Sequence, residues 1–564
     1  MGDVLSTSAA ALSAFSTTFR RNDELTDQRI SHLLSNQASL AYYIAKNHDE
    51  ACVKTLMSQA TKQNNKPAMK IILEFIARRL RERLRNKAVR TWAGEEITGN
   101  GERETVLVCL YVGDCDIHMK YFYDLRIICR EYDAINNESS IARSQELLSD
   151  TVMTKQMNDL VHQAINSHGQ RLFEEHNNLE TISSGRIISS KSRGHVQDVC
   201  IIVYCRLKGV IPFGEAPFPK QLKVNNKESV ALDVREGFFS YQSDTLERLS
   251  TQPAVLLEID SYLSETLPLL STQPNQSPLK MGCNVGSSGC NISGTLGPFV
   301  RINGNNIGFL TCAHVVCGNA LDQLKDLPTQ IRKGRMRREV VQPANSGEIC
   351  GRLLNAVFNS NWIDSTSNET CQSYDHTSRN AFGIDAAVIE ITSRFPIIGE
   401  FASLCNLQLD KAGFTQDQPP RFNTGESMTF PIMNHFQRLV IKVGSETGLT
   451  RGIIGLTNGM VQYSSIHGNV GSINNTMEKP QIWHNVMQIH PTSERFCAPG
   501  DSGAGVFLLG DHNTLTCIGL LIGALSDGTG IVTPIDKVLT ALNQDRGLRI
   551  ELQSFLHDVV EEDR

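Results

Sequence analysis

The sequence predicts a multidomain protein in which a helical and α+β N-terminal half precedes an all-β C-terminal half. The chain has 564 residues, which is too long for a single hydrophobic core, so we expect about two to four domains. Apolar residues recur at helical spacing near the N-terminus. The second half instead carries short apolar runs bounded by glycine-rich turns, as β-strands do.

Composition narrows the class of protein. Hydrophobic residues make up 40% and charged residues 20%, which is typical of a globular protein, and the net charge of −6 does not predict nucleic-acid binding. The longest apolar run, 515–525, contains Thr, Cys and Gly, so we interpret it as a pair of core strands and expect no membrane span.

Fifteen cysteines without a secretory leader predict reduced thiols and a cytoplasmic, intracellular location. Disulfides between Cys312 and Cys317 or between Cys283 and Cys290 are the alternative.

Helical periodicity dominates the start of the chain. Residues 1–22 are predicted to be a flexible arm and 23–95 a helical region, with one amphipathic stretch over 30–44 and another helix from Pro67. The second helix has a basic face, which is either a solvated surface or a patch for an acidic partner, and this region is a candidate for binding another protein. The basic residues are Arg78, Arg79, Arg81, Arg83, Arg85, Lys87 and Arg90.

A small α+β domain is predicted over 100–245. It combines a long helix at 140–177 with strands at 186–188 and 199–204, separated by a polar turn. Residues 246–279 are predicted to be a helix followed by a proline-rich linker.

The chemistry is concentrated in the C-terminal half. The stretch Cys497–Leu508, CAPGDSGAGVFL, places Ser502 in a glycine-rich turn before an apolar strand. The amides of Gly500 and Ser502 can point at one spot in such a turn, as an oxyanion hole requires. A serine nucleophile also needs a histidine base and a group that orients it.

Candidates for both partners lie upstream. His314 ends the apolar strand GFLTCAHVV, and Asp385 opens the run GIDAAVIEI, where a carboxylate must be hydrogen-bonded or paired. Rival acids and bases lie in less suitable surroundings; they are Asp364, Asp375, His484 and His490.

These motifs carry a family resemblance. TCAHVV, GIDAAVIEI and PGDSGAGVF resemble the catalytic segments of trypsin/chymotrypsin-like serine proteases, in the same chain order. The segment 442–452, KVGSETGLTRG, resembles a hairpin of their intracellular, bacterial and viral relatives, and GIVTPI at 530–535 resembles the strand before their C-terminal helix. The resemblance covers residues 280–545 and implies a double six-stranded β-barrel, followed by a tail at 546–564.

The resemblance assigns further roles. It implies His314, Asp385 and Ser502 as a catalytic triad, Gly500 and Ser502 as the oxyanion hole, and Phe496 at the floor of the specificity pocket. No acid lies at that floor, so a preference for Arg or Lys is not expected. A polar surface insertion is predicted over 318–380, between the base and the acid.

Asp501 pairs with a new N-terminus in secreted relatives. The chain lacks the Arg-Ile-Val-Gly-Gly sequence from which that N-terminus is made. We therefore expect maturation without N-terminal clipping, or control by the N-terminal half.

The predicted function is a serine endopeptidase acting on protein or peptide substrates, with no metal or organic cofactor. One alternative is a signalling or scaffold protein whose protease-like domain binds a partner with little turnover. A second is a viral-type protease that cuts its own chain at 268–279.

Overall fold

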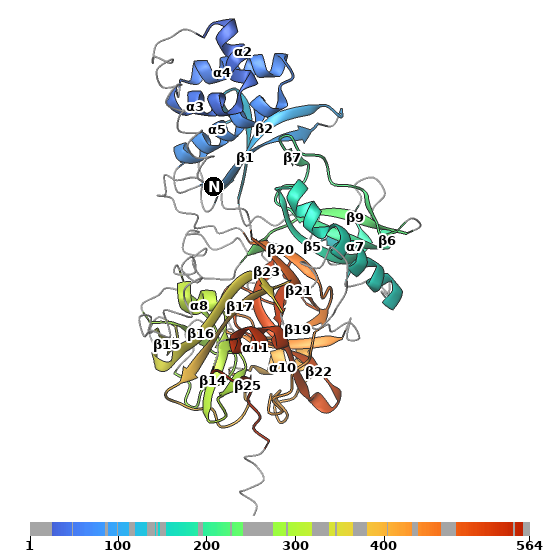
Figure 1. The fold of residues 1–564 in the computed structure, drawn as a ribbon. Coiled ribbons are helices and arrows are strands. Elements are labelled where there is room, and N and C mark those ends of the chain that lie inside the picture. The colour runs from blue at the N-terminus through green and yellow to red at the C-terminus, as the bar shows by residue number, and fades with distance from the viewer. Residues whose placement is uncertain are drawn as a thin grey trace, which may run out of the picture. The chain divides into compact units, whose positions relative to one another are not determined.

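The structure is a computed structural model that is mostly β-sheet with some helices (Figure 1). It describes residues 25–47, 49–84, 88–98, 100–111, 119–131, 141–142, 145–146, 154–189, 196–225, 228–240, 275–288, 292–318, 338–344, 347–364, 381–402, 404–430, 438–463, 481–493, 495–544 and 547–556. The chain divides into two compact units, residues 1–134 with 209–217 and residues 135–208 with 218–564. The predicted arm at 1–22 lies outside the described residues.

The first unit packs helices against one face of a small sheet with strand order β3-β4-β2-β1-β7. Helix residues such as Leu56 and Ile76 share one core with Leu107 of the sheet. Its elements are α2 (Asp27–Ser35), α3 (Gln37–Lys46), α4 (Glu50–Lys62), α5 (Lys66–Leu84), β1 (Ala88–Ile97), β2 (Arg103–Tyr111), β3 (Tyr121–Phe122), β4 (Leu125–Glu131) and β7 (Val210–Pro212).

The predicted single stretch over 30–44 is wrong, although its helical character is confirmed. The chain leaves the helix at Asn36, whose side chain accepts a hydrogen bond from Ser39 N at 3.0 Å and so caps α3. A residue that favours capping therefore splits the apolar periodicity into α2 and α3.

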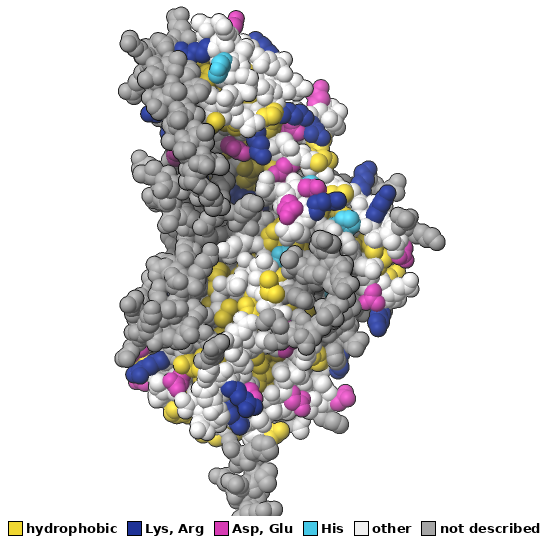
Figure 2. All heavy atoms as spheres, viewed as in Figure 1, with side chains coloured by type: hydrophobic (Ala, Val, Ile, Leu, Met, Phe, Trp, Pro, Cys, Tyr) yellow, Lys and Arg dark blue, Asp and Glu magenta, His cyan; other side chains and the backbone are white. Residues whose placement is uncertain are grey.

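The basic face of α5 is partly neutralised. Arg79 pairs with Glu82 at 2.8 Å, and the guanidinium of Arg78 lies over the Phe75 ring, 5.5 Å from its centroid. Figure 2 shows acidic and basic side chains interspersed on the face that it displays. Arg85 and Lys87 lie outside the described residues.

The second unit contains two large sheets. The 8-stranded sheet has the order β12-β11-β15-β16-β17-β14-β13-β25. Its strands are β11 (Asn284–Ser287), β12 (Ser293–Thr295), β13 (Phe299–Ile302), β14 (Asn306–Thr311), β15 (Glu339–Gln342), β16 (Glu348–Ile363), β17 (Ala381–Ile391) and β25 (Ile550–Leu552).

The 12-stranded sheet has the order β10-β23-β22-β18-β19-β21-β20-β5-β6-β9-β8, with β24 paired to β21 and β23. Its strands are β5 (Leu179–Ile188), β6 (Val196–Cys205), β8 (Gln221–Lys223), β9 (Ser229–Glu236), β10 (Phe239–Ser240), β18 (Leu439–Gly444), β19 (Gly448–Ile454), β20 (Gly459–Tyr463), β21 (Gln481–Pro491), β22 (Gly505–Leu509), β23 (Leu515–Leu525) and β24 (Gly530–Pro534). The helices of this unit are α7 (Lys155–Glu175), α8 (Ala313–Cys317), α10 (Asn406–Ala412) and α11 (Ile535–Asn543), and η5 (Asp511–Asn513) is a 3₁₀ turn.

Three sequence expectations change in this unit. The run 515–525 is a single strand, β23, and not a strand pair, because β22 and β24 flank it continuously and leave no turn. The described parts of the predicted 318–380 insertion include β15 and β16, which pair within the sheet, while most of its remainder lies outside the described residues. In the predicted tail, β25 pairs with β13, so the sheet extends beyond residue 545.

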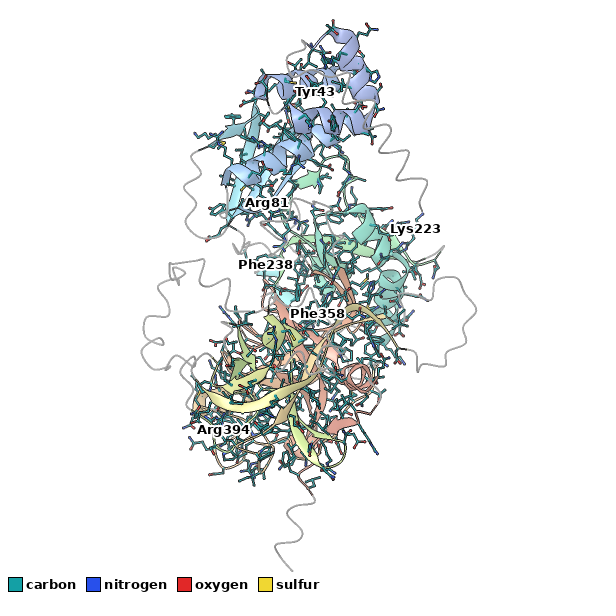
Figure 3. The ribbon with its side chains drawn as sticks, turned by 60° about the vertical axis from the view of Figure 1, so that its left-hand side comes forward. Tyr43, Arg81, Lys223, Phe238, Phe358 and Arg394 are labelled. Atoms are coloured by element: carbon teal, nitrogen blue, oxygen red, sulfur yellow. The ribbon has the colours of Figure 1, made fainter. Side chains whose placement is uncertain are left out.

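The two sheets meet through buried aromatic packing. The rings of Phe358 in β16 and Trp483 in β21 lie 5.3 Å apart, and Figure 3 labels Phe358 at this junction. A Cβ added at Gly383 of β17 would approach the Trp483 ring to 2.7 Å. Only glycine at this position therefore lets β17 lie so close to Trp483. This contact holds β17 against the 12-stranded sheet.

Strands β5, β6, β8 and β9, which follow α7, are part of the 12-stranded sheet. β20 pairs with β5 through Met460 and Ile182, and the Gln488 side chain of β21 donates to Ile182 O at 2.9 Å. The two-unit division therefore runs through the predicted 100–245 domain, since β2 and β7 belong to the first unit and β5, β6, β8 and β9 to the second.

None of the described helices has the length and apolar character that a membrane span requires. The described cysteines, among them Cys283, Cys312 and Cys317, carry thiols and not disulfide bonds.

We expect a buried histidine to make the second unit acid-sensitive. Burial lowers the pKa of His162 on α7 from 6.5 to about 4. Below pH 6.5 the unfolded chain therefore takes up a proton that the folded chain refuses, and stability is lost as the pH falls towards 4. The difference between the two pKa values corresponds to roughly 3 kcal/mol.

Denaturant unfolding against pH tests this effect. His162→Gln should flatten the loss of stability between pH 6.5 and about 4. His168→Gln, on the same helix but half-exposed, is the matched control and should behave as the wild type. An unchanged pH profile in His162→Gln would refute the prediction.

Candidate active site

His314 and Asp385 lie together in the 8-stranded sheet. His314 is in α8, directly after β14, and Asp385 is inside β17, which pairs with β14. The His314 amide donates to Asp385 Oδ1 at 3.2 Å, and its ring Nδ1 donates to Asp385 Oδ2. Both side chains are buried. The carboxylate therefore fixes the backbone and the ring of the same residue.

Ser502 lies in the turn that precedes β22. Its hydroxyl donates to Ile522 O of β23 at 3.3 Å, and not to His314. Its carbonyl accepts from Thr295 N of β12 at 2.8 Å. A Cβ on Gly294 would lie 2.4 Å from a Val315 methyl and 2.8 Å from Ser502 O. The Ser502 turn and α8 therefore both pack closely against Gly294.

Two glycines shape the turn. Gly500 and Gly503 have φ angles of 96° and 95°, in the region that favours glycine. Gly500 O accepts from Thr295 Oγ1 at 2.9 Å and Ser445 Oγ at 2.8 Å. Within the described part of the chain, the amides of Gly500 and Ser502 donate no hydrogen bond to the protein. Neither amide is therefore bound to an acceptor within the described residues.

Asp501 anchors the turn through a buried ion pair and several hydrogen bonds. Its carboxylate pairs with Lys442 Nζ of β18 at 2.7 Å, and both side chains are fully buried. Thr447 Oγ1 donates to Asp501 Oδ2 at 2.7 Å, and the Glu446 and Thr447 amides donate to Oδ1 at 3.0 and 3.2 Å. The Ala498 amide adds a bond to Oδ2 at 2.9 Å. A buried carboxylate with this many partners is well compensated for its loss of water.

The rival residues lie in other environments. Asp364 pairs with Lys537 Nζ at 2.8 Å, while Asp375 is outside the described residues. Burial lowers the pKa of His484 to about 4, and His490 lies 3.4 Å from Thr529 Oγ1. The described rivals are therefore engaged away from the Ser502 turn.

Phe496 and Cys312 are fully buried side chains. The Phe496 ring packs between Gly452 and Gly530, whose added Cβ atoms would approach it to 2.9 and 2.6 Å. Donor atoms of Cys312, His314 and Asp385 lie within 4.8 Å of one another, which is a spacing that a metal ion could use. Burial and the nearby Asp385 raise the pKa of the Cys312 thiol, which donates to Leu521 O at 3.2 Å, whereas a metal requires the thiolate.

Sequence reasoning missed the residues that hold the turn. Lys442 and Thr447 belong to the segment at 442–452 that carries the family resemblance, but no role followed from it. A lysine within an alternating apolar strand was the available signal, since a buried lysine needs an acidic partner. Thr295 and Ile522 act through a hydroxyl and a carbonyl, and neither has a distinctive sequence signature.

Several solved structures of serine proteases are similar to about half of the chain. Similar solved structures include the Nocardiopsis protease NAPase (16% identity, 49% of this chain and 98% of that chain, TM-score 0.27) and the Cellulomonas bogoriensis chymotrypsin (17%, 49% and 98%, 0.27). The MamO protease domain from Magnetospirillum magneticum is similar at 9% identity, 47% and 97% coverage and a TM-score of 0.22. These structures belong to the superfamily that the motifs predict. No family model and no curated protein matches the chain.

Removing Lys442 should destabilise the protein strongly. Lys442→Met keeps an unbranched side chain but leaves Asp501 as a buried charge without its cation, and breaking such a pair costs roughly 3–5 kcal/mol. Urea unfolding measures the loss.

The matched control is the exposed pair of Arg549 and Glu551, whose atoms lie 2.7 Å apart with side chains 77% and 54% exposed. Arg549→Ala should cost far less, because water already solvates both charges. Equal losses in the two variants would contradict the anchoring role of Lys442.

Proposed function

We propose that the chain is a serine endopeptidase with Ser502 as nucleophile, His314 as general base and Asp385 as the group that orients the base. The observation that carries the proposal is the double attachment of His314 to Asp385 beside a turn with two available amides. The two sheets would correspond to the two barrels of a chymotrypsin-like fold, with the base and acid from one sheet and the nucleophile from the other.

The first chemical step requires a small rotation. The Ser502 hydroxyl must leave Ile522 O and present its proton to His314 Nε2, while its oxygen attacks the carbonyl carbon of the substrate. Asp385 accepts from Nδ1, so it selects the tautomer whose Nε2 can take the proton and it stabilises the resulting imidazolium. The proton then passes to the leaving amine, and water hydrolyses the acyl-enzyme.

The negative oxygen of the tetrahedral intermediate would lie between the amides of Gly500 and Ser502. Each such donor is worth roughly 3–4 kcal/mol in the transition state. The two hydroxyls on Gly500 O hold the next peptide of the turn, so the loop does not have to reorganise during the reaction.

Lys442 supports maturation without N-terminal clipping. Asp501 already has a cation and four donors within the chain, so no new N-terminal amine is needed to fill its site. The specificity pocket is assigned with Phe496 at its floor, and we propose apolar selectivity there because its buried ring offers no charge.

A binding module with little turnover is the second candidate. The hydrogen bond from the Ser502 hydroxyl to Ile522 O favours it, because that bond directs the proton away from His314. The two candidates differ in whether Ser502 reacts.

Labelling with a fluorophosphonate probe, which forms a covalent bond to an activated serine, distinguishes them. The full-length wild type should label, whereas Ser502→Ala should not. Asp385→Asn should slow labelling at least about a thousandfold, because the tautomer of His314 is no longer fixed.

Asp364→Asn, a buried carboxylate paired elsewhere, is the matched control and should label at the wild-type rate. A folded wild-type protein that does not label would favour the binding module.

A further inference from the structure

The edge of β23 that faces Ser502 is already occupied by the chain itself. β22 pairs along this edge as far as Gly505 with Leu520, and the catalytic turn follows with Gly503 N bonded to Leu521 O and the Ser502 hydroxyl to Ile522 O. β10 comes next, pairing Ser240 with Ala524 and Phe239 with Leu525. The opposite edge of β23 belongs to β24.

A peptide substrate that extends from Ser502 along β23 would use the same edge. Extended peptides commonly bind by adding a strand to an exposed sheet edge. A chain that brings its carbonyl carbon to Ser502 and continues along β23 reaches Ala524 two residues after Ile522, a distance of about 7 Å. It would meet β10 there.

β10 is held by a fitted aromatic side chain. Phe239 is 5% exposed, and a Cβ added at Gly523 would lie 2.7 Å from both the Phe239 ring and Ser240 O. The backbones of Phe238 and Ser526 also bond, with Ser526 N donating to Phe238 O at 2.9 Å. Because Gly523 has no side chain, it leaves room for an aromatic ring beside the catalytic turn, and we call this space the aromatic seat.

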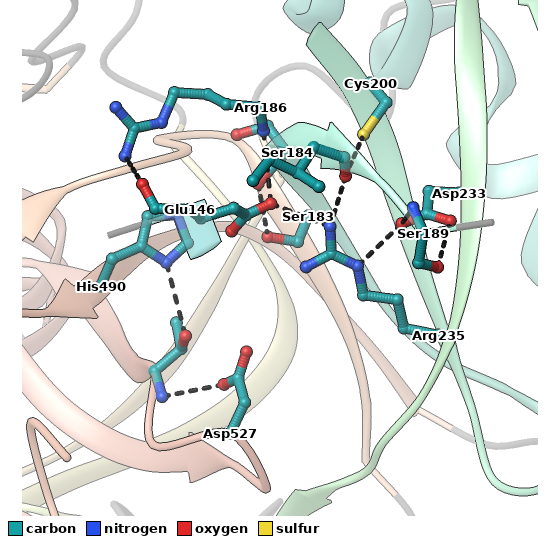
Figure 4. Close-up of polar contacts among 12 residues, drawn as sticks. Glu146, Ser183, Ser184, Arg186, Ser189, Cys200, Asp233, Arg235, His490 and Asp527 are labelled. Atoms are coloured by element: carbon teal, nitrogen blue, oxygen red, sulfur yellow. Dashed lines mark hydrogen bonds and ion pairs between the residues drawn. The ribbon is translucent and has the colours of Figure 1, made fainter. Parts of the chain in front are cut away.

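Side-chain contacts hold Phe238, the residue before β10, and the turn after β23. The Arg206 guanidinium lies over the Phe238 ring, 5.2 Å from its centroid, and Figure 3 labels Phe238. Tyr204 OH donates to Asp527 Oδ2 at 2.7 Å, which ties β6 to the turn after β23. Asp527 in turn accepts a hydrogen bond from the amide of Thr529, whose hydroxyl contacts His490 (Figure 4). Figure 4 also shows the buried ion pair between Arg235 and Glu146, whose atoms lie 2.8 Å apart.

We propose that the β23 edge from Gly523 to Ser526 is a peptide-binding site for extended chains with an aromatic residue opposite Leu525, and that β10 occupies this site in cis and inhibits the protease. The inference rests on the proposed function for its effect on hydrolysis, but the binding site itself does not require that Ser502 react. A substrate or partner peptide must displace β10 before it can pair with β23.

Peptide binding in a Ser502→Ala background tests the site independently of catalysis. The probe is a fluorescein-labelled synthetic peptide with the sequence of residues 234–240, VREGFFS. Phe239→Ala weakens β10 and empties the aromatic seat, so the peptide should bind this variant at least about tenfold more tightly than the parent chain. A peptide in which the second Phe is Ala should lose that gain.

Two further variants control for structural damage. Leu222→Ala in β8 removes a buried side chain of the same sheet far along the strand order and should bind the peptide as the parent does. Tyr204→Phe removes the hydrogen bond to Asp527, which follows Ser526, the residue that bonds to Phe238, and it should loosen β10 in the same direction as Phe239→Ala, by a smaller factor.

The same variants with Ser502 intact test inhibition. Phe239→Ala should hydrolyse extended peptides at least about tenfold faster than the wild type, while the small fluorophosphonate probe labels both at similar rates. Equal peptide binding by Phe239→Ala and its parent, when both are folded, would overturn the site. A Ser502-dependent cut of the wild-type chain directly after β10 would overturn inhibition, because β10 would then deliver a substrate. Absence of labelling in every chain would refute the proposed function and leave the binding result to stand by itself.

Discussion

The buried ion pair between Lys442 and Asp501 is the constraint on which the turn around Ser502 depends. Neither side chain is exposed, and the Asp501 carboxylate also accepts from Thr447 and from backbone amides on both sides of the pair. Such a cluster is costly to assemble and costlier to break. It fixes Asp501, which lies between Gly500 and Ser502 in the turn.

Two sheets then have to meet at this turn. Gly383 allows β17 to lie against Trp483, and Gly294 allows both α8 and the Ser502 turn to pack closely against it. A Cβ at Gly383 would lie 2.7 Å from the Trp483 ring and one at Gly294 would lie 2.4 Å from Val315, so a side chain at either position would push the packed segments apart. The positions of His314 and Ser502 therefore depend on small residues far apart in the sequence.

Sequence reasoning reached the local chemistry better than the long-range architecture. The apolar strand ending at His314 and the acid in β17 were predictable, because strand patterns and a paired carboxylate are visible in short windows. The type of residue at Asn36 also favours a helix cap, but the apolar periodicity continues across it and predicts one unbroken helix. The pairing of β10 with β23 could not be predicted, because it joins residues nearly three hundred positions apart through backbone groups that every residue carries. The ion pair of Lys442 with Asp501 lies between these cases, because both residues belong to recognisable motifs but their pairing depends on the fold.

Cleavage of a diverse peptide mixture, followed by mass spectrometry of the new termini, tests the central claim most directly. The wild-type chain should generate new peptide termini that Ser502→Ala and His314→Gln do not generate, with apolar residues enriched before the cut. A folded wild-type protein that cleaves no peptide, or a Ser502→Ala protein that cleaves as well as the wild type, would contradict the assignment of Ser502 as the nucleophile of a protease.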